Sequence, residues 1–247
     1  MSKLVRLLDL IRVCKNWIAV LANRIWAKPL AAIELRSGIK FLVKNRIEKA
    51  ELAILADIWQ RHIYDPDFLP IGESDAVVDI GAHKGYFSVY AAKKAGRGKV
   101  YSFEPLPRLS QFITANSRIN KLANIVVNNA AVWSKPGPID LYVSSNSGGS
   151  SVRPKPSSIE TVKVQSFTLE DFCDTNQIDS IDFLKLDCEG AEYDILLTLP
   201  VRVIRMIKKI AMEIHDFDSH HHSQIKKHLT ENNFKVTINN GYLYAFR

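Results

Sequence analysis

Apolar residues follow two different periods along this chain. From residue 76 onward, short runs rich in Val and Ile alternate with segments whose apolar residues have helical spacing. Predicted strands lie at 76–81, 99–104, 124–132, 181–187 and 207–216, and predicted helices lie at 86–95, 107–120 and 190–198. Strands that alternate with helices indicate a mostly parallel sheet covered on both faces. The pattern therefore predicts a doubly wound α/β fold.

Three segments depart from this alternation. Residues 139–164 predict two strands around the loop SSNSGGSSVRPKPSS, which is of a kind that can lie over a site. The last segment, NFKVTINNGYLYAFR, predicts two strands joined at Asn240 and Gly241, an antiparallel edge that closes the sheet. Near the N-terminus, AIELRSGIKFLV (32–43) predicts a further hairpin, and helical spacing returns over 47–62.

Residues 3–26 place apolar side chains near helical spacing with basic residues between them, which predicts one amphipathic basic helix. We favour the interpretation that such a helix packs on its own domain or on a second subunit. The alternative is that it lies on an anionic membrane surface. The longest apolar run, 16–23, is far shorter than the roughly 20 residues that cross a bilayer. No transmembrane segment or signal peptide is predicted. We expect an extension over 1–70 and a main domain over 71–247.

Composition narrows the class of protein. Of 247 residues, 47% are apolar and 24% are charged, as in ordinary soluble globular proteins. The net charge of +7 is concentrated in residues 3–28, which hold six basic residues and one acid, so the core is not predicted to bind nucleic acid. The widely spaced Cys14, Cys173 and Cys188 indicate free thiols. The expected location is the cytoplasm, with the membrane periphery as the alternative.

The segment VVDIGAHKGYFS (77–88) places Asp79, Gly81 and Gly85 where the first core strand ends and a helix begins. Ligands of open α/β sheets lie beyond this end of the strands, and glycine lets a ligand approach the main chain. Asp79 either holds the turn or reaches the ligand. The spacing is not the dinucleotide fingerprint, and a carboxylate disfavours a pyrophosphate. With Glu104 at the next strand tip, suited to a ribose diol, the motif predicts a cationic adenosyl ligand.

Acidic residues also follow the strand predicted at 181–187. In KLDCEGAEYD, Asp187 and Glu189 alternate and are expected to face the pocket. Carboxylates in such a position are unusual unless they are paired, hydrated or functional. Asp187 could hold a ligand ammonium, act as a base or bind a metal. The structural alternative is that these side chains cap the helix over 190–198.

A second pair lies in AMEIHD, where Glu213 and His215 share one face of a predicted strand. In the predicted topology this strand neighbours the one that ends at Asp187, so the two pairs are expected to converge. His215, oriented by Glu213, could act as a base; half of a metal site and a satisfied histidine are the alternatives. The histidines of DSHHHSQIKKH (218–228) diverge from one another and predict a polar loop and helix start, not a metal site.

VVDIGAHKGYFS, SFEPLP, NNAAVW, the SGGSS loop and FLKLDCEGAEYDIL together resemble the FkbM family of S-adenosylmethionine-dependent methyltransferases. The resemblance runs from about residue 64 to residue 215 and leaves the N-terminal helix outside. It implies the seven-stranded, Rossmann-like class I methyltransferase fold with S-adenosylmethionine as cofactor. It also implies cofactor contacts, with Asn129 and Ala130 near the adenine, at Asp79, Gly81, Ala82, Gly85, Tyr86, Phe87, Glu104, Asn129, Ala130 and Asp187.

The implied reaction is methyl transfer to an acceptor held in line with the sulfonium. An alcohol must also lose its proton, so the clustered acids favour O-methylation, with Asp187, Glu189 and His215 as candidate bases. The expected partner is a small-molecule or glycan acceptor, since family members often act on hydroxyls of sugars and natural products. A divalent metal and a homo-oligomer are compatible with the sequence but not predicted. An NAD-dependent oxidoreductase and a non-catalytic membrane-associated scaffold stay open as alternatives.

Overall fold

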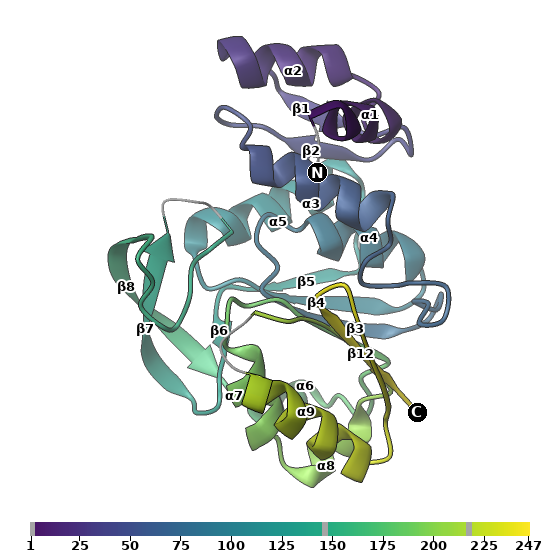
Figure 1. Cartoon of the computed structure of the whole chain (residues 1–247), viewed down its shortest axis with the longest axis vertical. Coiled ribbons are helices and arrows are strands. Elements are labelled where there is room, and N and C mark those ends of the chain that lie inside the picture. The colour runs from purple at the N-terminus through teal and green to yellow at the C-terminus, as the bar shows by residue number, and fades with distance from the viewer. Residues whose placement is uncertain (1–2, 145–147, 216–218) are drawn as a thin grey trace.

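The computed structural model describes residues 3–144, 148–215 and 219–247. The elements are α1 Lys3–Val13, α2 Trp17–Trp26, β1 Ala32–Glu34, β2 Lys40–Leu42, α3 Lys49–Trp59, β3 Ala76–Ile80, α4 Tyr86–Lys94, β4 Lys99–Phe103, α5 Pro107–Ile119, β5 Ile125–Asn128, β6 Ala131–Val132, β7 Gly137–Ser144, β8 Ser158–Phe167, α6 Leu169–Asn176, β9 Phe183–Leu186, α7 Glu192–Thr198, α8 Val201–Met206, β10 Lys209–Glu213, α9 Ser219–Glu231, β11 Lys235–Asn239 and β12 Tyr242–Phe246. They form the layers seen in Figure 1.

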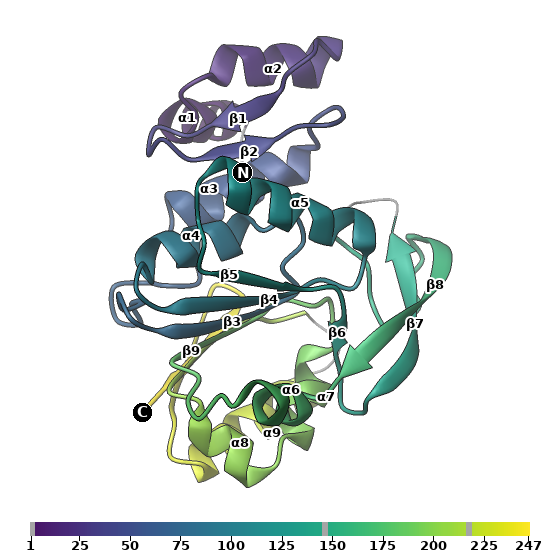
Figure 2. The same ribbon diagram turned by 180° about the vertical axis from the view of Figure 1, so that it is seen from behind.

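Seven strands make one twisted sheet in the order β11-β12-β10-β9-β3-β4-β5. The strands from β10 to β5 are parallel, and β11 and β12 complete the sheet as an antiparallel pair. Helices α3, α4 and α5 cover one face, and α6 to α9 cover the other (Figures 1 and 2). Neighbouring residues Val77 and Val78 lie in the two opposite core clusters, so these strands are buried on both sides. The predicted class I architecture is confirmed.

The strand predicted over 124–132 is in fact two strands in two sheets. β5 belongs to the large sheet, whereas β6 pairs with β8 in a small sheet of order β6-β8-β7. Between them the side-chain amide of Asn129 donates hydrogen bonds to the main-chain oxygens of Glu104 and Pro105, at 2.9 and 3.0 Å. These bonds fix the point where the chain leaves the large sheet. The predicted strands around the Gly/Ser loop are β7 and β8; residues 145–147 of that loop lie outside the described residues.

The single helix predicted over 3–26 is also wrong, because the chain turns at residues 14–16 between α1 and α2. The Lys15 amide donates to the Glu34 oxygen at 2.7 Å. The Asn16 side chain donates to the Ala32 oxygen and accepts from the Glu34 amide, both at 2.9 Å. Buried Cys14 forms an isolated bridge with Leu35. Pairing with the hairpin β1–β2 therefore outweighs continuation of the helix.

The N-terminal elements share a core with the main sheet. Leu10, Val13 and Val20 are buried in the same cluster as residues of α3 and α4. In Figure 1, α2 lies at the end of the molecule farthest from α8 and α9. None of the helices in the described parts of the chain combines the length and apolar character that a bilayer crossing requires. The division of the chain at residue 70 stays a prediction.

Candidate active site

A buried lysine joins the carboxyl ends of β3 and β9. Asp79 and Lys185 are register partners on these strands, so their side chains emerge on the same face. Lys185 Nζ lies 3.0 Å from Asp79 Oδ1 and donates to the Gly81 oxygen at 2.8 Å. Asp79, which is fully buried, also accepts a hydrogen bond of 2.6 Å from Ser88 Oγ. In this structure Asp79 thus holds the turn, and its contact with a ligand stays a prediction.

The two glycines of the motif are required by packing within the chain. Both have positive φ, 80° at Gly81 and 81° at Gly85. A Cβ on Gly81 would lie 1.8 Å from the main-chain oxygen of Asp187, and one on Gly85 would lie 3.0 Å from Ile113. Gly81 therefore brings the end of β3 directly against the chain that follows β9. This close approach explains the glycine without a ligand.

Glu104 follows β4 at the same edge of the sheet. Its two carboxylate oxygens accept hydrogen bonds from the His83 and Leu106 amides, both at 2.9 Å. Burial raises the pKa of Glu104 to about 7, against the effect of these two bonds. An ionised carboxylate has about four acceptor positions, so Glu104 keeps room for the two hydroxyls of a ribose.

The other residues implied in cofactor binding lie around this turn. Ala82, Tyr86, Phe87 and Ala130 are buried, and Asn129 is exposed beside Glu104. The Tyr86 hydroxyl donates to Glu51 at 2.6 Å, and the Phe87 ring packs on that of Tyr64 with centroids 5.2 Å apart. Both of these side chains therefore make contacts with other residues of the chain. These contacts do not test whether the residues bind the cofactor, so the cofactor contacts stay a prediction.

His83 is a polar residue of this turn that the sequence analysis did not single out. It has a left-handed backbone, with φ 54°, and its amide is used by Glu104. Both ring nitrogens are buried, and neither has a hydrogen-bond partner among the described residues. Burial lowers the pKa of His83 to about 4, so the ring is neutral and offers one donor and one acceptor. The ring centroid lies 5.9 Å from that of Tyr86, and the unmet polar atoms of the ring fit a site that receives a polar ligand.

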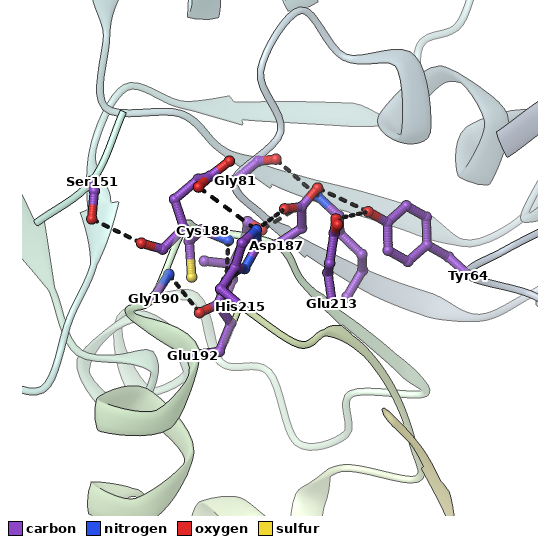
Figure 3. A network of polar contacts seen from close by, with 12 residues as sticks. Tyr64, Gly81, Ser151, Asp187, Cys188, Gly190, Glu192, Glu213 and His215 are labelled. Atoms are coloured by element: carbon purple, nitrogen blue, oxygen red, sulfur yellow. Dashed lines mark hydrogen bonds and ion pairs between the residues drawn. The ribbon is translucent and has the colours of Figure 1, made fainter. Parts of the chain in front are cut away.

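The two predicted pairs converge across β9 and β10. Asp187, Glu213 and His215 each offer an atom such that all three atoms lie within 4.8 Å of one another. Tyr64, from the loop before β3, donates its hydroxyl to Asp187 Oδ2 at 2.8 Å and lies 3.4 Å from Glu213 Oε2 (Figure 3). This spacing would allow one cation, and within the described residues it is the one such group. Convergence of the pairs is confirmed.

The carboxylate that orients His215 is Glu192, not Glu213 as predicted. His215 Nδ1 lies 3.0 Å from Glu192 Oε1 (Figure 3). Buried Glu192 also accepts hydrogen bonds from the Cys188 and Gly190 amides at 2.6 and 2.7 Å. These amides precede α7, so the helix entry is held by Glu192 and not by Asp187 or Glu189. The capping alternative for Asp187 and Glu189 is therefore wrong.

Charges around His215 determine the protonation of the cluster. Burial disfavours the imidazolium, but Glu192, Asp187 and Glu189 outweigh it and raise the pKa of His215 to about 9. Burial also disfavours ionised Asp187, yet Lys185 and His215 hold its pKa below the usual value. Burial and the charge of Asp187 raise the pKa of Glu213 to about 7. At neutral pH the site holds an imidazolium, an ionised Asp187 and a Glu213 in mid-titration.

The Gly/Ser/Pro loop lies over this cluster, as predicted, in its described part. Ser151 Oγ donates to the Glu189 main-chain oxygen at 2.8 Å, and Lys155 forms an ion pair with the Glu189 carboxylate (Figure 3 shows Ser151). Arg153 pairs with Asp194 of α7 at 2.7 Å. The histidine run begins α9, where the His222 ring stacks on Tyr193 with centroids 6.1 Å apart; residues 216–218 lie outside the described residues.

Known proteins resemble this chain along most of its length. The family model of the methyltransferase FkbM domain matches residues 79–236. Methyltransferase sdnD of Sordaria araneosa is 24% identical in a match that covers 74% of this chain and 82% of sdnD. AMB antimetabolite synthetase AmbE of Pseudomonas aeruginosa is 23% identical in a match that covers 66% of this chain but 9% of AmbE.

Among solved structures, the methyltransferase FkbM from Methylobacillus flagellatus superposes with a TM-score of 0.54 at 14% identity. The match covers 98% of this chain and 58% of that one, so the chain spans less than two thirds of that protein. The likeness supports the fold, and the family match, which includes the turn after β3 and the cluster after β9, supports methyl transfer over the two alternatives. The chain belongs to the FkbM family of S-adenosylmethionine-dependent methyltransferases.

Proposed function

We propose that this methyltransferase acts on a hydroxyl oxygen of a small-molecule acceptor, such as a sugar, a glycan or another natural product. The observation that carries the proposal is the convergence of Asp187, Glu213 and His215 within 4.8 Å. A hydroxyl is a weak nucleophile that must lose a proton, and these groups supply proton acceptors and a positive charge. A nitrogen or carbon acceptor would have less need of them.

The turn after β3 and the tip of β4 are our candidates for holding the cofactor. Glu104 would accept hydrogen bonds from ribose hydroxyls, and the unmet ring nitrogens of His83 would find polar partners. Asn129 and Ala130 would border the adenine, as the family resemblance implies. S-adenosylmethionine supplies an electrophilic methyl group on a sulfonium when it is bound. These buried groups with unfilled hydrogen-bonding capacity fit such a ligand.

In the proposed reaction, Asp187 accepts the hydrogen bond of the acceptor hydroxyl, and Glu213 beside it is the first candidate to receive the proton. Asp187 itself is a weaker proton acceptor, because Lys185 and His215 hold its pKa low. Tyr64 fixes Asp187 Oδ2 by the 2.8 Å hydrogen bond. His215, charged at neutral pH and held by Glu192, stabilises the developing oxyanion. Glu213 has a pKa of about 7, close to the working pH expected of an efficient proton carrier. The loop that carries Ser151 and Lys155 would limit access of water.

The test uses S-adenosylmethionine with a carbon-13 methyl group, incubated with the protein and a pool of hydroxylated small molecules and glycans. We expect label in methyl ethers, which the carbon-13 chemical shift separates from N-methyl and C-methyl products. His215→Asn should reduce transfer at least about 100-fold and keep the calorimetric heat of S-adenosylhomocysteine binding. His62→Asn is the control, because His62 is half exposed and has φ 52°, a conformation that Asn adopts readily. Label on nitrogen or carbon would contradict the proposal.

A further inference from the structure

The outward face of α2 is apolar, which is the reverse of an ordinary surface helix. Ile18 and Ile25 lie seven residues apart and so share a face. They are 67% and 54% exposed, and Trp26 at the end of the helix is 68% exposed. Val20 and Asn23 form the buried side. The helix packs on its own domain through this buried side, as we favoured, and its opposite side leaves large apolar residues in solvent.

Exposed apolar side chains are concentrated in this part of the protein. Leu7 and Leu8 of α1 are also exposed, at 37% and 42%. The described residues contain twelve exposed large apolar side chains, and five of them belong to the first 26 positions. Single apolar residues on a surface need no explanation, but a group of them marks an interaction site. Nothing in the described chain covers α2 on this side, and Figure 1 shows it at the far end of the molecule.

The same part of the chain carries all of the net charge. Residues 1–48 contain ten basic and three acidic residues, whereas residues 49–247 contain 23 of each. Two of the three acids are already paired: Asp9 with Arg61, and Glu34 with Lys40 at 3.2 Å. The unit that exposes an apolar helix face is therefore strongly positive, and the remainder of the protein is neutral.

Cations lie directly beside the apolar face. Lys28 Nζ is 5.9 Å from the centre of the Trp26 ring. An open groove of about 530 Å³ runs from the C-terminal end of α2 to the β2–α3 connection. Exposed Lys44 and Arg46 line it together with Pro29 and Leu30. The surface thus combines apolar side chains that can enter a hydrocarbon boundary with basic groups at the level of phosphate head groups.

We propose that this α2 surface, formed by Ile18, Ile25, Trp26, Lys28 and the adjoining groove, docks the enzyme on an anionic phospholipid bilayer. A second copy of the chain is a poorer occupant, because a twofold interface through this surface would bring two units of charge +7 together. An anionic leaflet instead attracts the basic residues, and the interface region accepts Trp and Ile side chains. The proposal does not depend on the acceptor being a hydroxyl.

Flotation of the full chain with vesicles tests the proposal. We expect binding to vesicles of phosphatidylcholine mixed with phosphatidylglycerol, and much weaker binding to phosphatidylcholine alone. The variant Ile18→Ser/Ile25→Ser/Trp26→Ser should weaken binding at least about tenfold. A matched control replaces three apolar residues that are exposed elsewhere, Ile159→Ser/Phe167→Ser/Ile238→Ser, and should bind as the wild type does. Circular dichroism and thermal unfolding show that each variant is folded.

The electrostatic part is tested by Lys28→Gln/Lys44→Gln, which removes the cation beside Trp26 and one that lines the groove, and should weaken binding about fivefold for each charge removed. The pair Lys121→Gln/Lys235→Gln, exposed on the main domain, is the control and should change little. Equal flotation of wild type and the α2 triple variant would overturn the proposal, as would absence of binding at low salt. A dimer in analytical ultracentrifugation that the triple variant dissociates, without any lipid binding, would assign the surface to a second copy instead.

Discussion

At the carboxyl ends of β3 and β9 the chain buries charges, whereas along α2 it exposes large apolar side chains. Asp79, Lys185 and Glu192 are buried, and each has partners within the chain. Ile18 and Trp26 are apolar and mostly in solvent. Buried charges must be neutralised internally or the fold is lost. Exposed apolar residues impose no such condition, so the first region is constrained by stability, and we propose that the second is constrained by contact with a bilayer.

Removal of the buried lysine should destabilise the fold at the carboxyl ends of β3 and β9. Lys185→Met leaves Asp79 ionised and unpaired in a fully buried position, so we expect the free energy of unfolding to fall by about 3–5 kcal/mol. Urea denaturation measures the change. The control is Lys208→Met, because Lys208 is exposed and its Nζ lies 2.6 Å from Asp182 Oδ1, with an expected loss below about 1 kcal/mol. Equal losses in the two variants would mean that burial of the charge pair does not decide stability.

The pH dependence of stability tests the charge around His215. A pKa raised from 6.5 to about 9 means that the folded state holds the proton more tightly. This stabilisation is complete below pH 6.5 and is lost as the pH rises through 9, a decrease of about 3 kcal/mol in the free energy of unfolding. Glu213, with a pKa raised to about 7, acts in the same direction between about pH 4.5 and 7.

Part of the loss of stability between pH 7 and 10 also comes from the three thiols whose pKa values burial raises, those of Cys14, Cys173 and Cys188. The difference between wild type and His215→Asn in urea denaturation over this range therefore isolates the histidine: His215→Asn should reduce the slope, and His62→Asn should retain the wild-type slope. Glu192→Gln, which removes the nearest negative charge, should give an intermediate slope because Asp187 and Glu189 remain. A wild-type curve that is flat from pH 7 to 10 would contradict the assignment of an imidazolium at neutral pH.

A smaller effect is expected where the N-terminal unit is attached. Asn16→Ala removes two hydrogen bonds to β1, and leaves the Glu34 amide and the Ala32 oxygen without the partner they had. We expect a loss of about 1–2 kcal/mol, measured by urea denaturation. Hydrogen exchange would then be faster in α1 and α2 than in β3 or β9. Uniform acceleration over the whole chain would show instead that this unit opens only with the main core.

The strand and helix order of the main sheet was predictable because it depends on local periodicity. Buried strands need continuous apolar runs, which are visible in the sequence. The acidic residues of the site stand at the ends of the runs that form the neighbouring strands β9 and β10. The short helices α6 and α8 were not predicted, since six to eight residues give little periodic signal. The prediction of one strand over 124–132 was wrong for a related reason. The hydrogen bonds of the Asn129 side-chain amide that mark the division involve residues 24 and 25 positions away.

The contacts that complete the site could not be derived from local patterns. Tyr64 lies in the connection between α3 and β3, yet its hydroxyl meets Asp187 from 123 positions away. Glu192 lies within the helix predicted over 190–198, but its contact with His215 follows from the way β9, α7 and β10 pack together. His83 gave a weak signal, as a non-glycine residue between two glycines. Long-range packing decides which carboxylate orients a base, and spacing alone does not.

The smallest expected effect is that of a chelator, which tests whether protein cations suffice at the acidic cluster. Asp187 lies 3.7 Å from Lys185 Nζ and 3.8 Å from His215 Nε2, and Glu189 is paired with Lys155. A divalent ion would have to displace these partners and deprotonate a ring whose pKa is about 9. We therefore expect EDTA to leave both methyl transfer and the heat of S-adenosylhomocysteine binding unchanged. Loss of transfer with EDTA, restored by Mg²⁺ in the wild type but not in Glu213→Gln, would instead assign a metal to this cluster.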